Sequence, residues 1–520
     1  MKTRIISSIA LLLLLSLLLG SFVACKNEET PPETGSTSEV EDTTGGEKDE
    51  YDPGEVNYGG YEYEMLTETN SKSYNLYLYL GEGVPSQVTD MALWQREGMM
   101  DAKYGVKLKL NNQKDKATAL ETIRNSVGSG QSSADIIMIN GEYTMVIAQE
   151  GHIYDVNTLP NLNLEASYWD QRIQSEYKIG ESLYCLEGDF NFADELSTFV
   201  VIYNDTFYES YGYYDTYGSP YELASQGKWT YEKMQEMIKD CASDKDGGGV
   251  MDENDIWGMV SESKLPYYIL IGSGKKTLTN RDGEFTFDIK DNGWANVQDI
   301  LEKGMELLIN DDTIIADGKT GHYITNSGAM WDIASDIFKY NRALFRTTSL
   351  SAVTRLIDME SDYGIMPIPA YEETSPEDAA YYCWLEPYLH YPMSFPVSAR
   401  DVEKTTQITE IFAYTSRYGA DSLYNAFFDL LAYARLCRTG NDIEMLKLVF
   451  ANKCFDMDQA LGITRLLNKV ADATRNNATA EGAMGAINNR FTAGDIETYE
   501  LLMKEIVLNL SVNGKTYPLN

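Results

Sequence analysis

The chain has 520 residues, with 80 acidic residues against 42 basic ones and a formal net charge of −38. This acidity argues against nucleic acid as a partner, because phosphate binding requires basic patches, and against charge-driven adsorption to anionic lipid. The length predicts two or three domains, and a hydrophobic content of 43% is ample for a large core.

The first 24 residues have the pattern of a secretory signal peptide. Lys2 and Arg4 give a basic start, an apolar run covers 5–19, and small residues precede Cys25. The run of about fifteen residues is shorter than the ~20 that a membrane-spanning helix needs. We therefore expect residues 1–24 to be removed rather than retained as a membrane span.

Cys25 sharpens this expectation. The segment Val23-Ala24-Cys25 resembles the bacterial lipoprotein signal, although Phe22 stands where Leu is usual. The resemblance implies that Cys25 is lipidated and anchors the chain to the extracellular face of the cell membrane. A plain secretory signal is the alternative. Residues 25–72 are acidic and poor in apolar side chains, which predicts a disordered linker.

Strand and helix patterns alternate from residue 73 onward. Buried-type apolar runs are typical of parallel strands, and alternation with helices predicts an α/β fold with right-handed crossovers. A second α/β unit begins near Thr198. Strands are expected at 74–80, 106–110, 134–139 and 198–203, and helices at 87–103 and 116–127.

A helix is predicted after Thr230, which occupies the N-cap position, and an acidic glycine-rich loop follows at Asp244–Asp255. The loop has acids at positions 1, 3, 9 and 12 and Gly at position 6, as a calcium loop would. Position 5 is Gly248, however, and position 12 is Asp rather than the bidentate Glu. We interpret the loop as an acidic surface turn and place no metal there, with a structural calcium ion as the alternative that stays open.

Several motifs occur in the order of a known family. They are "YELASQGKWTYEKMQEM" at 221–237, the acidic loop followed by "DIWG" at 255–258, "YNDTF" at 203–207, the segment 341–373, and the helical stretch 402–461. This ordered set resembles the extracellular solute-binding proteins of family 1, the sugar-binding, maltose-binding-protein-like lipoproteins of ABC importers. Asn341 stands where Gly is frequent. The likeness covers nearly all of the chain from Ser73 onward.

The resemblance implies a two-lobe, periplasmic-binding-protein-like (type II) α/β fold with the ligand in the cleft between lobes. One lobe would comprise 73–193 and about 390–435, and the other 197–385 and about 440–520, including a helical C-terminal portion. The crossings would lie near Asn191–Glu195 and Trp384–Pro392. The implied partners are a sugar and the subunits of an ABC permease. We expect a monomer without cofactor or catalytic activity.

Candidate ligand-binding residues follow from this arrangement, because ligands of parallel sheets bind beyond the carboxyl ends of the strands. Sugars stack on aromatic rings and donate hydrogen bonds to Asp, Glu and Asn. The two tryptophans among the candidates lie in polar, non-periodic segments. The candidates are Glu82, Glu142, Tyr143, Asn191, Asp194, Trp331 and Trp384, and Thr347-Thr348 also follow a predicted strand.

Two other functions stay open. A non-sugar solute such as a peptide or a polyamine would suit acids in the cleft. A secreted glycoside hydrolase needs two carboxylates at ~5 or ~6.5–9.5 Å, and the abundance of acids leaves that possible. Other chemistry lacks support: the three His are far apart, no HExxH or GxSxG occurs, and the cysteines form no CxxC.

Overall fold

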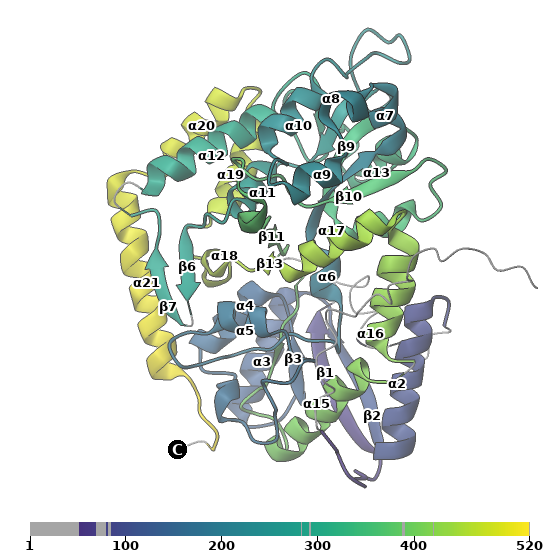
Figure 1. Ribbon diagram of the computed structural model, residues 1–520. Helices are drawn as coiled ribbons and strands as arrows, with labels where there is room; N and C mark the ends of the chain where they lie inside the picture. Colours follow the sequence, from purple (N-terminus) through teal and green to yellow (C-terminus); the bar gives the residue numbers. More distant parts are fainter. Residues whose placement is uncertain are drawn as a thin grey trace, which may run out of the picture. The chain divides into compact units, whose positions relative to one another are not determined.

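The computed structural model describes residues 51–68, 78, 80–81, 85–281, 283–290, 293–386, 390–419 and 421–518. The predicted signal peptide, Cys25, Glu82 and most of the strand expected at 74–80 lie outside these residues. The described part is an α/β fold with a four-stranded and a five-stranded main sheet (Figure 1). The predicted fold class is confirmed. We call each main sheet, with the helices that pack on it, the first and the second lobe.

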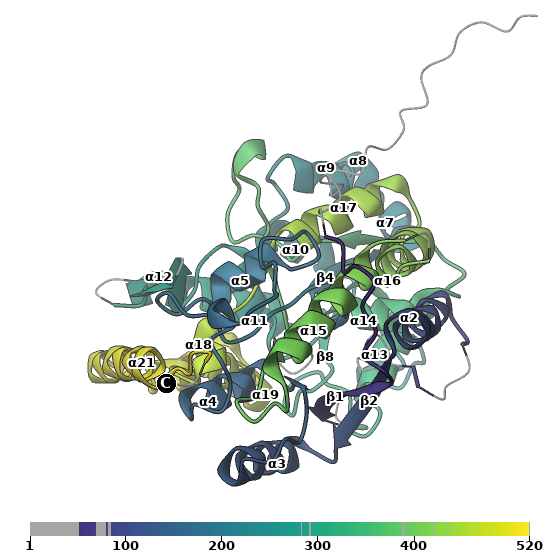
Figure 2. The same cartoon turned by 90° about the horizontal axis from the view of Figure 1, so that it is seen from below.

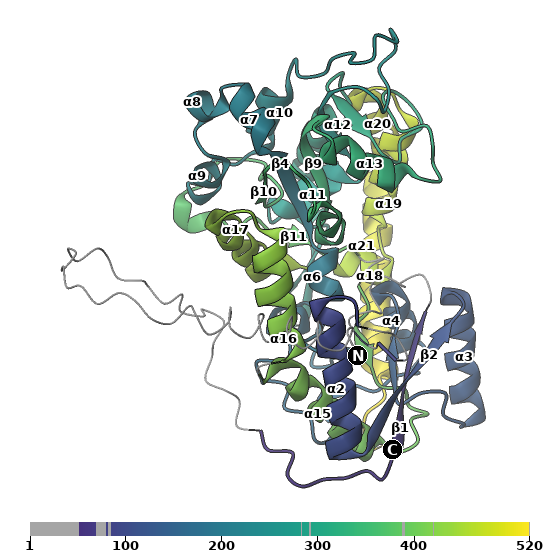
Figure 3. The ribbon, with the colours of Figure 1, turned by 90° about the vertical axis from the view of Figure 1, so that its right-hand side faces the viewer.

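The first lobe is built on the sheet β12-β3-β1-β2. β3 and β2 both run parallel to β1, and β12 is antiparallel to β3. Figures 2 and 3 show β1 and β2 between α3 on one side and α2 with α15 on the other. Its elements are β1 (Tyr61–Glu68), α2 (Val88–Tyr104), β2 (Val106–Gln113), α3 (Lys116–Ser129), β3 (Ile136–Met138), α4 (Gly141–Gln149), α5 (Gln171–Tyr177), β12 (Met393–Ser394) and α15 (Val402–Arg417).

Strand β1 corrects the predicted domain boundary. It lies within the stretch 25–72 that was expected to be a linker, yet it sits between β3 and β2 in the sheet. Tyr63, Met65 and Leu66 are fully buried. The sequence does not predict this strand for two reasons. The acidic residues before it are typical of a linker, and three glutamates lie among its own apolar side chains. The fold therefore begins before residue 61 rather than at residue 73.

The second lobe is built on the sheet β10-β4-β9-β5-β8. β9, β5 and β8 are parallel, whereas β4 runs antiparallel to both β9 and β10. The carboxyl ends of β5, β8 and β9 therefore share an edge with the start of β4. The strands are β4 (Phe199–Asn204), β5 (Trp257–Ser261), β8 (Thr313–Ile315), β9 (Ala343–Ser349) and β10 (Tyr363–Met366).

Helices pack on the second sheet, and a separate two-stranded hairpin (β6, Leu278–Arg281; β7, Glu284–Phe287) contacts α5 of the first lobe. The helices of this lobe are α7 (Asp205–Ser210), α8 (Tyr213–Tyr217), α9 (Pro220–Ser225), α10 (Tyr231–Ile238), α11 (Leu265–Gly272), α12 (Gly293–Leu308), α13 (Met330–Lys339) and α14 (Leu350–Val353). The predicted cap of α10 is confirmed: the Thr230 hydroxyl accepts a hydrogen bond from the Lys233 amide at 3.3 Å. Asn341 has φ of 56°, a left-handed conformation that Gly adopts most easily.

Three chain segments lie side by side where the lobes join. They are α6 (Ala193–Ser197), β11 (Cys383–Trp384) with the residues after it, and β13 (Lys453–Cys454). The Glu386 amide donates to the Ser197 carbonyl at 3.2 Å, and the Leu385 amide donates to the Cys454 carbonyl at 3.1 Å. Figure 1 shows α6 between the two lobes. The first predicted crossing, Asn191–Glu195, overlaps α6. The second predicted crossing includes residues 387–389, outside the described residues.

The C-terminal helices contact both lobes, as the yellow ribbon in Figure 3 shows. α20 packs on α12 of the second lobe, whereas α18 and α21 pack on α4 of the first. The prediction that all of 440–520 belongs to the second lobe is therefore wrong for these two helices. The elements of this region are α16 (Leu423–Asn425), the π-helix η6 (Ala426–Leu436), α17 (Gly440–Ala451), α18 (Met457–Leu461), α19 (Leu466–Asn476), α20 (Ala480–Asn488) and α21 (Ala493–Asn513).

The five cysteines in the described residues, at 185, 241, 383, 437 and 454, are free thiols. Within the same part of the chain, no helix combines the length and the apolar character that crossing a membrane requires.

Candidate ligand-binding site

A pocket of about 480 Å³ opens at the edge of the second sheet where β5, β8 and β9 end. Hydroxyl groups, charged groups and aromatic rings all line it. The hydroxyl-bearing residues include Ser261, Thr347, Thr348 and Ser349; the charged ones are Glu262, Lys264, Arg346, Arg355 and Glu386; the aromatic ones are Phe199 and Trp331.

The position of the pocket follows from the topology. Parallel strands end at a common edge, and the residues just beyond those ends face open space that the next helix has not yet covered. Ser261 ends β5, and its hydroxyl lies 2.6 Å from that of Thr347 on the neighbouring β9. Phe199 begins β4 directly after the crossing helix α6. The pocket therefore lies in the second lobe, next to the junction between the lobes.

Two acids and a lysine form the charged floor of the pocket. Lys264 Nζ lies 2.6 Å from a carboxylate oxygen of Glu386, and both side chains are largely buried. Although burial opposes it, the neighbouring Glu386 and Glu262 raise the pKa of Lys264, so the amine stays charged. Glu262 accepts a hydrogen bond from the Tyr268 hydroxyl. Burial raises the pKa of Glu262 to about 7.

Arg346 lies in the middle of β9, and only 3% of its surface is exposed. Its Nη1 atom is buried without a hydrogen-bond partner, and its guanidinium forms no ion pair with any described residue. Burial lowers the pKa of Arg346 to about 10, which still leaves it charged at neutral pH. The pocket thus contains a buried cation that pairs with no other described residue.

The two candidate tryptophans differ sharply. Trp331, in α13, is 45% exposed and lines the pocket, as do Thr347 and Thr348. Trp384 is 1% exposed, and its ring packs against those of Tyr267 and Tyr268. Trp384 is a core residue in this structure and offers no surface to a ligand. The sequence does not predict the burial of Trp384, because the strand β11 is too short to show an apolar periodicity.

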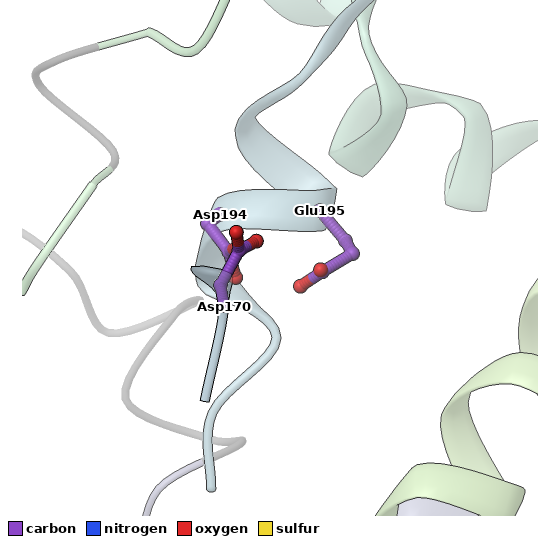
Figure 4. Close-up of side chains that lie close together, drawn as sticks. All are labelled: Asp170, Asp194 and Glu195. Carbon is purple, nitrogen blue, oxygen red and sulfur yellow. The ribbon is translucent and has the colours of Figure 1, made fainter. Parts of the chain in front are cut away.

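Asn191 and Asp194 have structural roles at the crossing. The Asn191 side-chain oxygen accepts a hydrogen bond from the Ala193 amide at 3.0 Å. Figure 4 shows the carboxylates of Asp170, Asp194 and Glu195 gathered together. Such a group could hold a metal ion, but Lys453 Nζ already lies 2.9, 2.6 and 2.5 Å from them, respectively. The lysine supplies the cation, so neither predicted residue is open to a ligand.

The two acids of α6 have opposite protonation tendencies. Burial and the adjacent charge of Asp194 raise the pKa of Glu195. Burial would also raise the pKa of Asp194, but the Lys453 ammonium outweighs it and holds that pKa below its usual value. Beside Lys453, the ionised form is thus favoured for Asp194 and the protonated form for Glu195.

Glu142 and Tyr143 lie in the first turn of α4, away from the residues that line the pocket. Glu142 is 3.8 Å from Arg465, and Lys116 Nζ lies 5.1 Å from the centre of the Tyr143 ring. Both residues follow β3, as predicted, but they belong to the other lobe. Glu82 lies outside the described residues.

The loop Asp244–Asp255 folds around its own backbone amides. The Asp244 carboxylate accepts hydrogen bonds from the amides of Gly247, Gly248 and Gly249. The buried Asp255 accepts from those of Lys245 and Asp252. Although Asp244, Asp246 and Asp255 are close enough to hold an ion, amide donors already compensate their charge, as in an acidic turn.

Sequence reasoning missed Glu262, Lys264 and Arg346. Arg346 had a usable signal: it interrupts the strand segment "ALFRTTS", in which every residue is buried. A charged residue in a fully buried strand is costly unless it has a partner or a ligand. Glu262 and Lys264 had no such signal in the sequence, because an acid and a lysine after a strand are common in loops.

Neither a family model nor a curated protein matches the sequence. Solved structures do match. A family 1 extracellular solute-binding protein from Bifidobacterium longum subsp. infantis aligns with a TM-score of 0.51 at 14% identity, over 83% of this chain and 99% of that one. The GacH receptor of Streptomyces glaucescens, solved unliganded and with acarbose, aligns with a TM-score of 0.50 at 9% identity, over 86% and 99%.

The chain has the two-lobe fold of these solute-binding proteins. The described pocket lies at the carboxyl ends of strands in one lobe of this fold, beside the segments that join the lobes. At these identities the likeness concerns the fold, and the ligand must be argued from the pocket itself.

Proposed function

We propose that this protein is a non-catalytic extracellular receptor of an ABC importer, which binds a carbohydrate in the pocket of the second lobe and delivers it to a permease. The observation that carries the proposal is the exposed ring of Trp331 at a pocket lined with hydroxyl groups and carboxylates. Aromatic faces suit the C–H faces of sugars, and these polar groups suit their hydroxyls.

The size of the pocket supports a small ligand. Its volume of about 480 Å³ falls within the ~300–1,000 Å³ of small-molecule sites. Its lining includes Phe199 and Glu386, which adjoin two of the crossing segments. A ligand seated there is well placed to contact the first lobe when the lobes close. A ligand that binds the closed form better shifts the equilibrium towards it.

The proposal includes a membrane tether. Lipidation at Cys25 and a linker before the fold would hold a monomeric receptor outside the cell near its permease. No chemistry on the sugar is required, since closure alone creates the shape that a permease recognises.

Binding and closure test the proposal together. A panel of mono- and oligosaccharides should include one that raises the melting temperature, because a ligand at 100 times its Kd adds ~2.7 kcal/mol of stability. Small-angle scattering with that sugar should then give a smaller radius of gyration. A bound form no more compact than the free one would contradict the clamp mechanism.

A hydrolase is the second candidate, because Glu262 and Glu386 both line the pocket. Each is held by a neighbour, Tyr268 and Lys264 respectively, which favours a binding role. Chromatography of the bound sugar after long incubation separates the two. Recovery of intact sugar supports the receptor; cleavage that the Glu262→Gln variant abolishes would establish the hydrolase.

A further inference from the structure

We propose that the sugar bound by this pocket carries an acidic group, a carboxylate or a sulfate, that pairs with the guanidinium of Arg346. This inference rests on the proposed function and specifies its substrate class. It is argued from the one charged side chain of the pocket that has no partner among the described residues.

Arg346 differs from the other buried cations described above. Lys453 lies among three carboxylates, and Lys264 pairs with Glu386. The guanidinium of Arg96 donates to two carbonyl oxygens and to the Ser416 hydroxyl. Among the described residues, no ion pair or hydrogen bond joins the Arg346 guanidinium to a carboxylate or a carbonyl, and its Nη1 atom is buried without a partner. The nearest acids that influence it are Glu262 and the exposed Asp336, and neither forms an ion pair with it.

A buried charge without a partner is costly, because it loses hydration and gains nothing in return. The cost is explained if the partner arrives with the ligand. The guanidinium is planar, and its paired N–H groups match the two oxygens of a carboxylate or of a sulfate. Arg346 also lines the pocket beside Ser261, Thr347 and Thr348, whose hydroxyls suit the remaining hydroxyls of a sugar.

The local charge also favours an anion. Of the three cations at the pocket, Lys264 is neutralised by Glu386 and Arg355 by Asp332, which leaves the charge of Arg346. Glu262 offsets it incompletely, since the pKa of Glu262 is about 7. A polyamine would have to enter against this positive charge. In a chain with a net charge of −38, the Arg346 guanidinium is a local positive charge that would attract and orient an acidic ligand.

The test compares matched sugars by calorimetry. The probes are galacturonate and trigalacturonate, galactose 6-sulfate, and neutral galactose and galactotriose. We expect an acidic probe to bind at least about 10-fold more tightly than its neutral counterpart, as one charge-assisted hydrogen-bonded pair would provide. Preference for the uronates identifies a carboxylate as the partner, and preference for galactose 6-sulfate identifies a sulfate.

Arg346→Gln should weaken binding of the preferred acidic probe about 10- to 100-fold and leave binding of the neutral counterpart nearly unchanged, whereas Arg346→Lys should retain part of the preference. Arg124→Gln, which removes a cation paired with Glu150 on the surface, is the control for net charge. Without ligand, Arg346→Gln should melt at the same or a higher temperature, because it removes an unpaired buried charge. A purely structural arginine would give a lower one.

The outcomes separate the two proposals. Equal affinity for acidic and neutral probes, unaffected by Arg346→Gln, would overturn this inference and leave the sugar receptor intact. Binding of the neutral probes alone would also overturn the preference for an acidic sugar and leave the sugar receptor intact. Absence of binding to every probe, acidic and neutral, would contradict both.

Discussion

Lys453 Nζ lies 2.6 Å from a carboxylate oxygen of Asp194, and this contact ties strand β13 to the crossing helix α6. The two residues are 259 positions apart in the chain, and both side chains are nearly inaccessible to solvent. Because the contact joins two of the segments at the junction of the lobes, it stabilises the region about which closure would occur. It is a structural ion pair at the junction of the lobes.

Replacing Lys453 by Met should be strongly destabilising. The substitution leaves Asp194 and its neighbours buried without their cation, which typically costs ~3–5 kcal/mol. Lys447→Met is a matched control, since its ammonium pairs with a largely exposed Glu444 at 3.1 Å and such pairs contribute at most ~1 kcal/mol. Urea denaturation measures both. Similar losses in the two variants would show that the cluster does not depend on Lys453.

Glu262 predicts a pH dependence of stability. Its pKa is about 7 in the folded state, above the ordinary 4.5, because it is buried. Between these values the folded state binds more protons than the unfolded state, so the free energy of unfolding falls as the pH rises. The contribution is on the order of 3 kcal/mol over the interval.

Glu262→Gln should flatten that dependence in part. Asp189, whose pKa burial also raises to about 7, is one of several buried acids that keep the remainder, with Glu195 among them. Denaturation curves between pH 4.5 and 7.5 provide the measurement. A profile identical to that of the parent protein would show that Glu262 titrates normally in the folded state.

The two tryptophans should respond differently to truncation. Trp331→Ala removes an exposed ring at the pocket and should weaken sugar binding by ~1–3 kcal/mol with little change in stability. Trp384→Ala empties a site in the core and should cost ~3–5 kcal/mol of stability. Calorimetry with the identified sugar and denaturation curves should be recorded for both. Loss of stability in Trp331→Ala alone would reverse the assignment.

Lipidation predicts a clear result in cells. Cys25→Ser should release the protein from the membrane fraction, because a single substitution removes the acceptor of the lipid. Cys437→Ser, which alters a thiol within the fold, is the control and should stay in the membrane fraction. Retention of Cys25→Ser to the same extent as the parent would indicate a different anchor or none.

Sequence patterns alone predicted the α/β class, the helices at 87–103 and 116–127, and the cap at Thr230. Each depends on local periodicity or on one side chain bonding to its own helix, and such features are legible along the chain. Asn341 is similar: a position where Gly is frequent proved to have a positive φ. The strand at 61–68 was missed because glutamates alternate with its buried residues.

The site depended on tertiary structure. The aromatic character of Trp331 and Trp384 can be read from the sequence, but only packing decides that Trp331 lines the pocket and Trp384 fills the core. Asp194 looked like a ligand contact until Lys453, distant in sequence, was found beside it. Arg346 interrupts a strand segment in the sequence, but only the fold shows that its charge is buried in a pocket and pairs with no other described residue. Local periodicity and local hydrogen bonds determine the helices and strands. The burial and pairing of each charged side chain depend on residues that are distant in the sequence and adjacent only in the fold.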